Sequence, residues 1–432
     1  MSIDPRETLD KAPMSLLQMV VVVITCMLNG LDGFDVLSIS FASNGIAKEW
    51  DMMPAELGVV LSMELIGMAI GSIILGGVAD KVGRRRTTLG CLSVMAVGMV
   101  MTTVVGNVTQ LSICRIFTGF GLGGLLAAIN AMSAEFANRK KRHMCVSLMS
   151  IGYPIGGVLG GFIAAWFLRH YEWRYIFYFG SAITAFFIPV VFFIVPESVQ
   201  WLVRAQPKDA LKRANEALRR MGHAIVDALP ELTPEARKKS LKDIFSPGLA
   251  GITVMVTIAY FLHVTTYYFI LKWAPRAAHS FWGFDMPSAA NVLTCANIGG
   301  VVGGVVFTLL TLRYDIKKLT IGVMFLGAAF IALFGSIPAN LIYAGLVAFG
   351  CGFFGNPAIV GMFALFAHVF PTHIRAAGTG FSVGIGRGGA ILSPIIVGFL
   401  IEGGFSLAAV TAIISIGGFI GAAVLLFVKL EK

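Results

Sequence analysis

Charged residues are scarce in this chain. Asp, Glu, Lys and Arg make up 13% of its 432 residues, hydrophobic residues make up 57%, and the mean hydropathy is +0.83. Soluble domains carry roughly 25% charged residues, so a water-soluble enzyme of two or three domains is excluded. Cysteine is sparse too, and the six cysteines lie in apolar runs without metal-ligand spacing. We therefore expect packing cysteines, with no disulfide framework and no metal site.

Long apolar runs are abundant, and they predict an all-α polytopic membrane protein. Runs of about 20 residues can cross a bilayer as helices, and they are too long for the roughly 9–11-residue strands of a membrane barrel. The first run is also too long for a signal peptide, so it is counted as a span. The sequence predicts twelve transmembrane helices, at residues 16–40, 56–79, 88–106, 111–134, 145–168, 174–195, 249–272, 289–311, 319–337, 341–367, 376–401 and 406–428.

The positive charge follows this topology. The net charge is +10, and with a cytoplasmic N-terminus the tails and loops on that side hold 26 Lys and Arg, against four on the opposite side. This asymmetry is typical of cytoplasmic loops. It explains the basic composition without nucleic-acid binding, and it predicts a multi-pass protein with cytoplasmic N- and C-termini.

One long polar interruption divides the spans into two groups of six. The predicted organisation is a cytoplasmic N-tail (1–15), an N-terminal six-helix half (16–196), a cytoplasmic linker (197–246), a C-terminal six-helix half (247–428) and a cytoplasmic C-tail (429–432). Two halves of similar length are typical of a duplicated transporter with a central substrate path. Glycine, with 50 residues, is interpreted mainly as a means of close helix packing.

The linker itself has helical periodicity. Apolar residues repeat at helical spacing after Pro207, with Lys and Arg on the other face, and Thr233-Pro234-Glu235 indicates the start of a second short helix. The preferred interpretation is an amphipathic linker lying against the inner leaflet of the membrane.

Acids inside the first span need a functional explanation. Asn29, Asp32 and Asp35 lie three residues apart, which places them along one helical face. A charge in the bilayer costs at least about 2.5–3.5 kcal/mol on insertion scales. Two carboxylates this close cannot both ionise cheaply in a dry site, so we expect one to carry a proton reversibly. The alternative is a buried polar stripe satisfied by neighbouring helices. Glu64, in the second span, is a further candidate for proton coupling.

Cationic residues within spans are candidates for substrate binding. Arg115 lies in the same half of the membrane as the two aspartates, where it can hold them ionised or hold an anionic substrate. Arg387 lies near the middle of the eleventh span, and it can bind a substrate carboxylate or the backbone carbonyls of a broken helix. In the seventh span, Tyr267 and Lys272 are candidates for a substrate cavity, and Trp273 fits a cavity or an interfacial belt. The segment 353–357 predicts a helix break in the tenth span.

Two motifs resemble those of the major facilitator superfamily. Residues 76–86 (GGVADKVGRRR) match the family's loop motif between the second and third spans, and Arg115-x-x-x-Gly119-x-Gly121-x-Gly123 matches its fourth-span motif. The resemblance implies that the loop motif is a conformational latch, with Asp80 paired to a helix end or an Arg in the outward-facing state. The matching latch residues are Gly76, Asp80, Lys81, Gly83, Arg84 and Arg86.

Within that superfamily, Asp32-Gly33-Phe34-Asp35 resembles the first-span motif of the aromatic acid/proton symporters. Gly386-Arg387 followed by Ser393-Pro394 resembles their eleventh span, and Trp273-Ala274-Pro275 the end of their seventh. The resemblance implies a proton-coupled importer of a hydroxybenzoate-like or lignin-derived aromatic acid in a bacterial inner membrane, in which Asp32 and Asp35 carry both proton coupling and substrate engagement. Asn29, on the same helical face, is a further candidate for substrate binding. Lys272 and Glu64 depart from the better-known members, which leaves room for a bulkier or doubly carboxylated aromatic substrate.

Two other functions remain open at this point. Residues 152–157 partly resemble the fifth-span motif of proton-driven exporters, so an exporter of organic anions or drugs is the alternative transporter. A transporter-like aromatic-acid receptor is the alternative from another class. An enzyme is least favoured, because there is no nucleophile elbow or phosphate loop. We expect an aromatic acid, protons and the lipid bilayer as partners, with no cofactor and with a monomer sufficient for function.

Overall fold

The computed structural model describes residues 4–230, 244–246, 249–370 and 374–428. Regular structure within these ranges is helical, which confirms the all-α fold class. Twelve long helices correspond one to one to the twelve predicted spans: α2 (Leu16–Glu49), α3 (Pro54–Val82), α4 (Arg84–Thr103), α5 (Val108–Phe136), α6 (Arg142–His170), α7 (Arg174–Ile194), α10 (Ala250–Trp282), α11 (Met286–Leu310), α12 (Ile316–Phe334), α13 (Leu341–Val369), α14 (Arg375–Glu402) and α15 (Leu407–Phe427).

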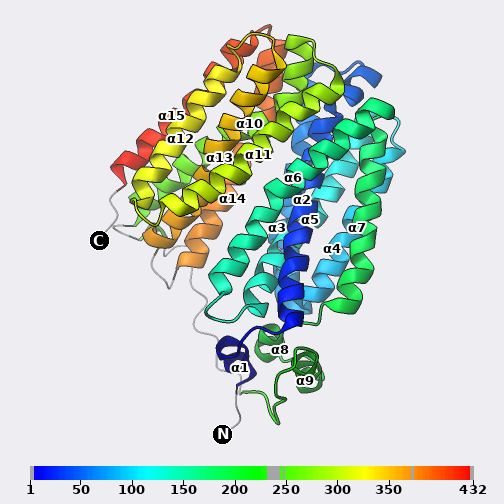
Figure 1. Cartoon of the computed structure of the whole chain (residues 1–432), viewed down its shortest axis with the longest axis vertical. Helices are drawn as coiled ribbons and strands as arrows, with labels where there is room; N and C mark the ends of the chain where they lie inside the picture. The colour runs from blue at the N-terminus through cyan, green and yellow to red at the C-terminus, as the bar shows by residue number, and fades with distance from the viewer. Residues whose placement is uncertain (1–3, 231–243, 247–248, 371–373, 429–432) are drawn as a thin grey trace. The chain divides into compact units, whose positions relative to one another are not determined.

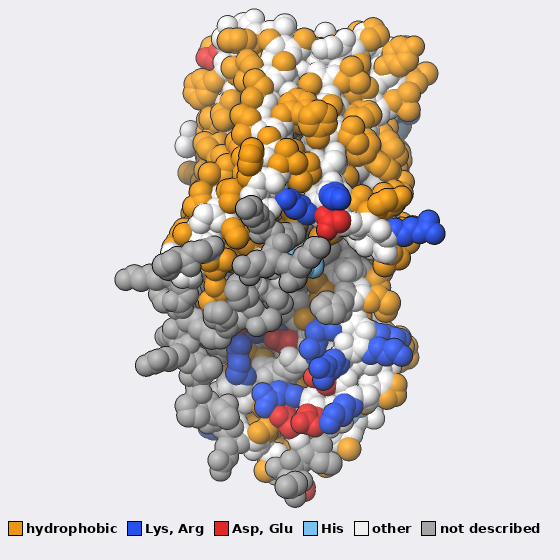
Figure 2. All heavy atoms as spheres, turned by 90° about the vertical axis from the view of Figure 1, so that its left-hand side faces the viewer, with side chains coloured by type: hydrophobic (Ala, Val, Ile, Leu, Met, Phe, Trp, Pro, Cys, Tyr) orange, Lys and Arg blue, Asp and Glu red, His pale blue; other side chains and the backbone are white. Residues whose placement is uncertain are grey.

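Eleven of these helices are long and apolar enough to cross a membrane. The twelfth, α4, begins with Arg84, Arg85 and Arg86 and contains four threonines, which lower its hydropathy. One face of the molecule shows the resulting separation of side chains: hydrophobic groups fill the upper part, and Lys, Arg, Asp and Glu gather below (Figure 2). Such a surface matches a protein that is solvated by lipid over much of its length.

The chain forms two compact units (Figure 1). The first unit contains residues 1–36, 66–156 and 177–236, and the second contains residues 37–65, 157–176 and 237–432. Four helices, α2, α3, α6 and α7, therefore contribute residues to both units. Asp35 lies just before the point where α2 leaves the first unit, and Glu64 just before the point where α3 leaves the second.

Backbone-to-backbone packing explains much of the glycine content. In the first unit, a Cβ on Gly33 would collide with the carbonyl of Tyr153, and one on Gly67 with the carbonyl of Ile116. In the second unit, the α11–α13 pair has the same arrangement, since Gly299 faces the carbonyl of Phe349. These contacts support close packing through small residues.

Three expectations about helix ends and breaks are corrected. The predicted spans end at residues 40 and 272, whereas α2 continues to Glu49 and α10 to Trp282. The reason is that helices extend past the apolar runs that identify spans. The predicted break at 353–357 is wrong: α13 is continuous, with Pro357 inside it. Proline removes the donor to the carbonyl four residues earlier. That carbonyl, on Phe353, lies against the backbone of Gly303 in α11, and neighbouring helices make such prolines tolerable in membrane proteins.

Three short helices gather at one end of the first unit (Figure 1): α1 (Pro5–Lys11), α8 (Val199–Ala205) and α9 (Ala210–Arg220). The α9 helix confirms the helix predicted after Pro207, whereas α1 and α8 were not predicted. Their N-caps are local, since the side chains of Asp4 and Ser198 accept hydrogen bonds from the following turns. The second predicted linker helix, at Thr233-Pro234-Glu235, lies outside the described residues.

Candidate functional site

The polar face of α2 is buried. Asn29, Asp32 and Asp35 are 3%, 1% and 0% exposed. Asn29 Nδ2 donates a hydrogen bond to the carbonyl of Met149 in α6, at 2.7 Å. Gly33, between the two aspartates, lets α2 contact α6 directly, which fixes the rotation of α2 and hence the direction of its acids.

Arg115 pairs with one of these acids. Its Nη2 donates to Oδ1 of Asp35 at 3.1 Å, and both side chains are fully buried. The guanidinium carbon also lies 5.2 Å from the centre of the Phe177 ring, a cation–π distance. The sequence suggested that this pairing was possible, and the structure brings Asp32, Asp35 and Arg115 into one unit. A fixed cation and two carboxylates form a site whose net charge rises by one unit with each proton bound, from −1 when both acids are ionised.

Two candidates that the sequence treated separately are joined in the second unit. Nζ of Lys272 in α10 lies 3.8 Å from Oε2 of Glu64 in α3, and both side chains are 0% exposed. Burial of an unpaired charge costs several kcal/mol, so each residue explains how the other is tolerated. The periodicity of neither helix alone indicated this pair, because it depends on how α3 and α10 pack.

The aromatic residues of α10 are packed inside the second unit. Tyr267 is 4% exposed, and its ring lies parallel to that of His263, with the centroids 6.1 Å apart. Nε2 of His263 donates to the carbonyl of Gly355, at 3.0 Å. Trp273 is 1% exposed and donates to the carbonyl of Pro394, at 3.1 Å. The interfacial-belt interpretation of Trp273 is therefore wrong, because its ring faces the protein interior.

Arg387 lies near the middle of α14 and is half-buried. The α14 helix is continuous around it, so the broken-helix alternative is wrong. The neighbouring Gly386 packs against the ring of Tyr260, and Gly389 against the carbonyl of Phe261. These two glycines hold α14 close to α10, whereas Gly384 has open space where its side chain would be.

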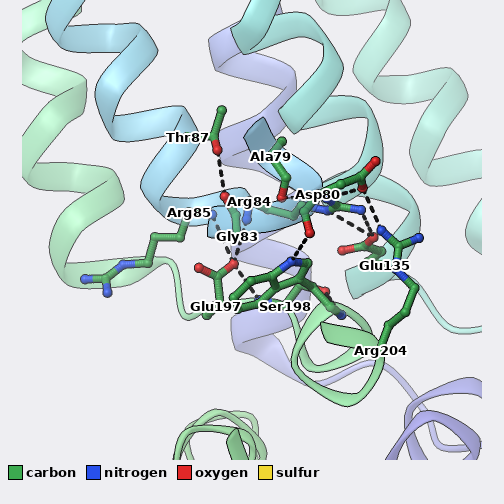
Figure 3. A network of polar contacts seen from close by, with 11 residues as sticks. Ala79, Asp80, Gly83, Arg84, Arg85, Thr87, Glu135, Glu197, Ser198 and Arg204 are labelled. Atoms are coloured by element: carbon green, nitrogen blue, oxygen red, sulfur yellow. Dashed lines mark hydrogen bonds and ion pairs between the residues drawn. The ribbon is translucent and has the colours of Figure 1, made fainter. Parts of the chain in front are cut away.

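The 76–86 motif lies at the end of α3 in the first unit, within a polar network (Figure 3). Oδ1 of Asp80 accepts hydrogen bonds from Arg84 Nη1 and Arg204 Nη2, each at 2.7 Å. Arg84 also donates to Glu135 at the end of α5, at 3.1 Å. The expected Asp–Arg pairing is thus present. Of the other motif residues, Lys81 and Arg86 are exposed and Gly76 packs against Ala127.

Glu197 completes this network from the segment between α7 and α8. Its Oε1 accepts from the backbone N–H groups of Arg84 and Arg85, at 2.8 and 3.1 Å, and thereby caps the N-terminus of α4 (Figure 3). A carboxylate at this position is favoured by the helix dipole. Burial raises the pKa of Glu197 above its ordinary value. Gly83 has a φ of +110°, and a Cβ there would collide with the Glu197 carboxylate, so glycine is required on both counts.

Three members of the network were not singled out as site residues from the sequence: Glu135, Glu197 and Arg204. The sequence could have indicated them, because each is a charged residue at the end of a predicted span or in the segment that follows one. Only the packing of α3, α4, α5 and α8 reveals that Arg204 pairs with Asp80, and that Glu135 and Glu197 both bind Arg84.

This arrangement of long helices, small-residue contacts and a charged loop network agrees with the comparison against known families. The sequence matches the Major Facilitator Superfamily over residues 22–356, which is more than half of the chain. The chain belongs to the major facilitator superfamily. Its fold and relatives are those of membrane transporters, not enzymes.

This transporter is similar to several curated bacterial proteins along nearly its whole length. A gallate transporter from Pseudomonas putida is 26% identical, over 98% of this chain and 94% of the relative. A benzoate transport protein from Acinetobacter baylyi is 26% identical (93% and 87%), and a 4-hydroxybenzoate transporter from P. putida is 28% identical (90% and 88%).

Solved structures of other transporters have the same fold. A D-xylose–proton symporter superimposes with a TM-score of 0.75 at 16% identity, covering 96% of this chain and 98% of the other. A nucleoside transporter gives a TM-score of 0.74 at 16% identity, with coverages of 95% and 99%. At such identities the likeness concerns the fold alone.

Proposed function

We propose that this transporter is a proton-coupled symporter that imports an aromatic carboxylate by alternating access. The observation that carries the proposal is the buried Asp35–Arg115 pair beside Asp32, in a chain similar to transporters of gallate, benzoate and 4-hydroxybenzoate. The ring of an aromatic acid suits a helix-lined apolar path, and its carboxylate requires a cation.

The proton site consists of Asp32, Asp35 and Arg115, with Asn29 on the same face. When both aspartates are ionised, the site carries one net negative charge, and one proton neutralises it. Neutralisation lowers the cost of moving these groups through a dry, closed state. Proton binding can thereby be linked to the change in access, while Arg387 in α14 holds the substrate carboxylate through two parallel hydrogen bonds.

We also propose the membrane orientation that the basic residues predict. The end of the first unit that carries α1, α8 and α9 faces the cytoplasm of a bacterial cell, with both termini on that side of the inner membrane. Residues 16–196 and 247–428 then form the two six-helix halves, joined by the 197–246 linker. A monomer holds every proposed site residue.

The direct test is uptake into proteoliposomes that contain the purified full-length protein. We expect radiolabelled 4-hydroxybenzoate, benzoate or gallate to accumulate when the outside is acidic, and to stop accumulating when a protonophore collapses the gradient. Net export of the same acids under this gradient would identify an antiporter. Saturable binding without uptake under any gradient would identify a receptor. Either result would overturn the symporter proposal.

We expect Asp80→Asn to slow transport while substrate affinity changes little. The substitution removes the charge that holds Arg84 and Arg204 together, and so it loosens the end of α3 in the state that this network stabilises. The populations of inward- and outward-facing states should shift, because a lost interaction changes only the states that contain it. Reactivity of single-cysteine variants on each face measures that shift.

Lys140→Gln is the matched control, because Lys140 is exposed, follows the end of α5 that carries Glu135, and lies outside the 76–86 motif. It should leave both rate and reactivity at wild-type values. Unchanged cysteine reactivity in Asp80→Asn would assign the network to folding of the α3–α4 junction instead of to a latch.

A further inference from the structure

Four arginines gather at the C-terminal end of α7, which ends at Ile194. Arg85 and Arg86 come from the start of α4, and Arg213 and Arg220 come from α9. The last three all lie close enough to Arg85 to repel it electrostatically, and all four belong to the first unit. The excess of Lys and Arg that is typical of cytoplasmic loops does not require arginines from two distant segments to meet at one helix end. We call these four residues the arginine cluster.

Two members of the cluster cap the C-terminus of α7. Arg220 Nη2 donates to the carbonyls of Phe193 and Ile194, at 2.8 and 3.0 Å. Arg85 Nη2 donates to the carbonyl of Phe192. Cations are favoured at a helix C-terminus, so these contacts stabilise α7. They use few of the five N–H donors of each guanidinium, and Nε of Arg85 has no hydrogen-bond partner within the described part of the chain.

The cluster carries more positive charge than its acidic neighbours balance. Glu197 attracts Arg85, and its Oε2 lies 3.8 Å from Nη2 of Arg213. The side chain of Arg85 points away from Asp80 (Figure 3), whose carboxylate binds other arginines. The α9 helix adds one exposed acid, Glu216. Four guanidinium groups therefore face two carboxylates, and an additional anion is favoured electrostatically.

The α7 helix places the cluster at the edge of the membrane core. It has 21 residues, and about 20 helical residues cross the hydrocarbon, so its last turn lies near the boundary. Phe192 and Phe193 in that turn are 51% and 70% exposed, as expected for side chains that face lipid. The phosphate groups of phospholipids lie just outside the hydrocarbon, at the level of the arginines that bind these carbonyls.

We propose that the arginine cluster binds the phosphate of an anionic phospholipid, whose acyl chains lie against Phe192 and Phe193. A guanidinium pairs with phosphate oxygens through two parallel hydrogen bonds, and basic sites beside membrane helices bind anionic head groups. The bound phosphate reduces the repulsion among the arginines and so ties α4 and α9 to the end of α7. This inference goes beyond the proposed function, because it depends on neither the substrate nor the direction of transport.

Native mass spectrometry of the purified full-length protein in detergent measures lipid binding directly. The probes are dioleoyl-phosphatidylglycerol, which is anionic, and dioleoyl-phosphatidylcholine, which has the same chains and no net charge. Wild type should bind one phosphatidylglycerol at least tenfold more tightly than phosphatidylcholine, because each basic residue near a membrane surface contributes about fivefold. Arg213→Gln/Arg220→Gln should weaken phosphatidylglycerol binding about 25-fold by the same reasoning, and the preference should disappear.

Arg313→Gln is the matched control, because Arg313 is an exposed arginine of the second unit, between α11 and α12. It should bind both lipids as wild type does. The double variant removes a cap of α7 and can fail to fold. Arg86→Gln then replaces an exposed member of the cluster, and it should weaken phosphatidylglycerol binding about fivefold.

Three results would overturn this inference. The first is equal affinity of wild type for the two lipids, and the second is an equal loss of phosphatidylglycerol binding in Arg313→Gln and in the cluster variants. The third concerns the source of the phosphate. Inorganic phosphate lacks acyl chains, so a roughly tenfold molar excess over lipid should displace little phosphatidylglycerol. Complete displacement at that ratio would identify the cluster as a site for free phosphate.

Discussion

Uptake driven by a pH gradient is expected to collapse when Asp32 or Asp35 is replaced with Asn. The amide keeps the shape and much of the hydrogen bonding of the carboxylate, but it cannot take up and release a proton. Both side chains are essentially fully enclosed, so water cannot substitute for the missing group. Initial rates of aromatic-acid uptake into proteoliposomes, at a fixed inward proton gradient, should fall at least a hundredfold in each variant.

The two variants differ in their effect on the buried Asp35–Arg115 ion pair. Asp35→Asn leaves the buried Arg115 beside a neutral amide, and removing one partner of a buried pair costs about 3–5 kcal/mol. Reduced membrane levels are therefore expected for Asp35→Asn, and they should be restored in Asp35→Asn/Arg115→Gln, which removes both charges. Asp32→Asn keeps both members of the Asp35–Arg115 ion pair, so it is the cleaner test of coupling.

Exchange of labelled for unlabelled substrate, without any gradient, provides the internal control. A variant that has lost only proton coupling should still exchange substrate, whereas a misfolded variant should not. The Thr25→Ser variant is the matched control for a buried polar residue of α2, because the Thr25 hydroxyl donates to the carbonyl of Val22 in the same helix, and it should keep gradient-driven uptake. Full gradient-driven uptake by both aspartate variants would show that the proton is carried elsewhere.

Much of the fold was predictable because a bilayer imposes simple requirements on a sequence. The apolar runs located all twelve long helices, since each must be about 20 residues long to cross the hydrocarbon core. The same reasoning placed the ends of α2 and α10 too early. Helix ends outside the core are determined by contacts such as the hydrogen bond from Asn44 to the carbonyl of Pro275, at 3.1 Å, and a count of apolar residues contains no record of such contacts.

The candidate site was predictable in its members but not in all of its pairings. Charged residues in apolar runs are conspicuous, and Asp35 and Arg115 could be matched by depth. Glu64 and Lys272 were conspicuous too, yet their pairing depends on the packing of α3 against α10 within the second unit. Proline was a misleading signal at Pro357. A proline in a membrane helix predicts a break only when no neighbouring helix accommodates the exposed carbonyl, and Gly303 provides that accommodation.

Substrate binding should weaken about ten- to a hundredfold in Arg387→Lys, although the positive charge is retained. A guanidinium and a carboxylate can form two parallel hydrogen bonds, which the single ammonium group of lysine cannot reproduce. Arg387 is half-buried in the middle of a continuous helix. A charge-assisted hydrogen bond lost in such a largely dry place costs about 1.5–3 kcal/mol. Arg387→Ala should weaken binding at least as much.

Two controls separate carboxylate recognition from general damage to α14. Arg276→Lys changes a partly buried arginine of the same unit, in α10, and it should bind 4-hydroxybenzoate as wild type does. The methyl ester of 4-hydroxybenzoate has no anionic group, so it should bind wild type poorly and Arg387→Ala about equally poorly. The difference in affinity between the acid and the ester should therefore disappear in Arg387→Ala.

If Arg387→Lys binds the acid as tightly as wild type, the carboxylate is held elsewhere. Arg115 and Lys272, two cations that are fully buried among the described residues, are then the next residues with which to repeat the same comparison.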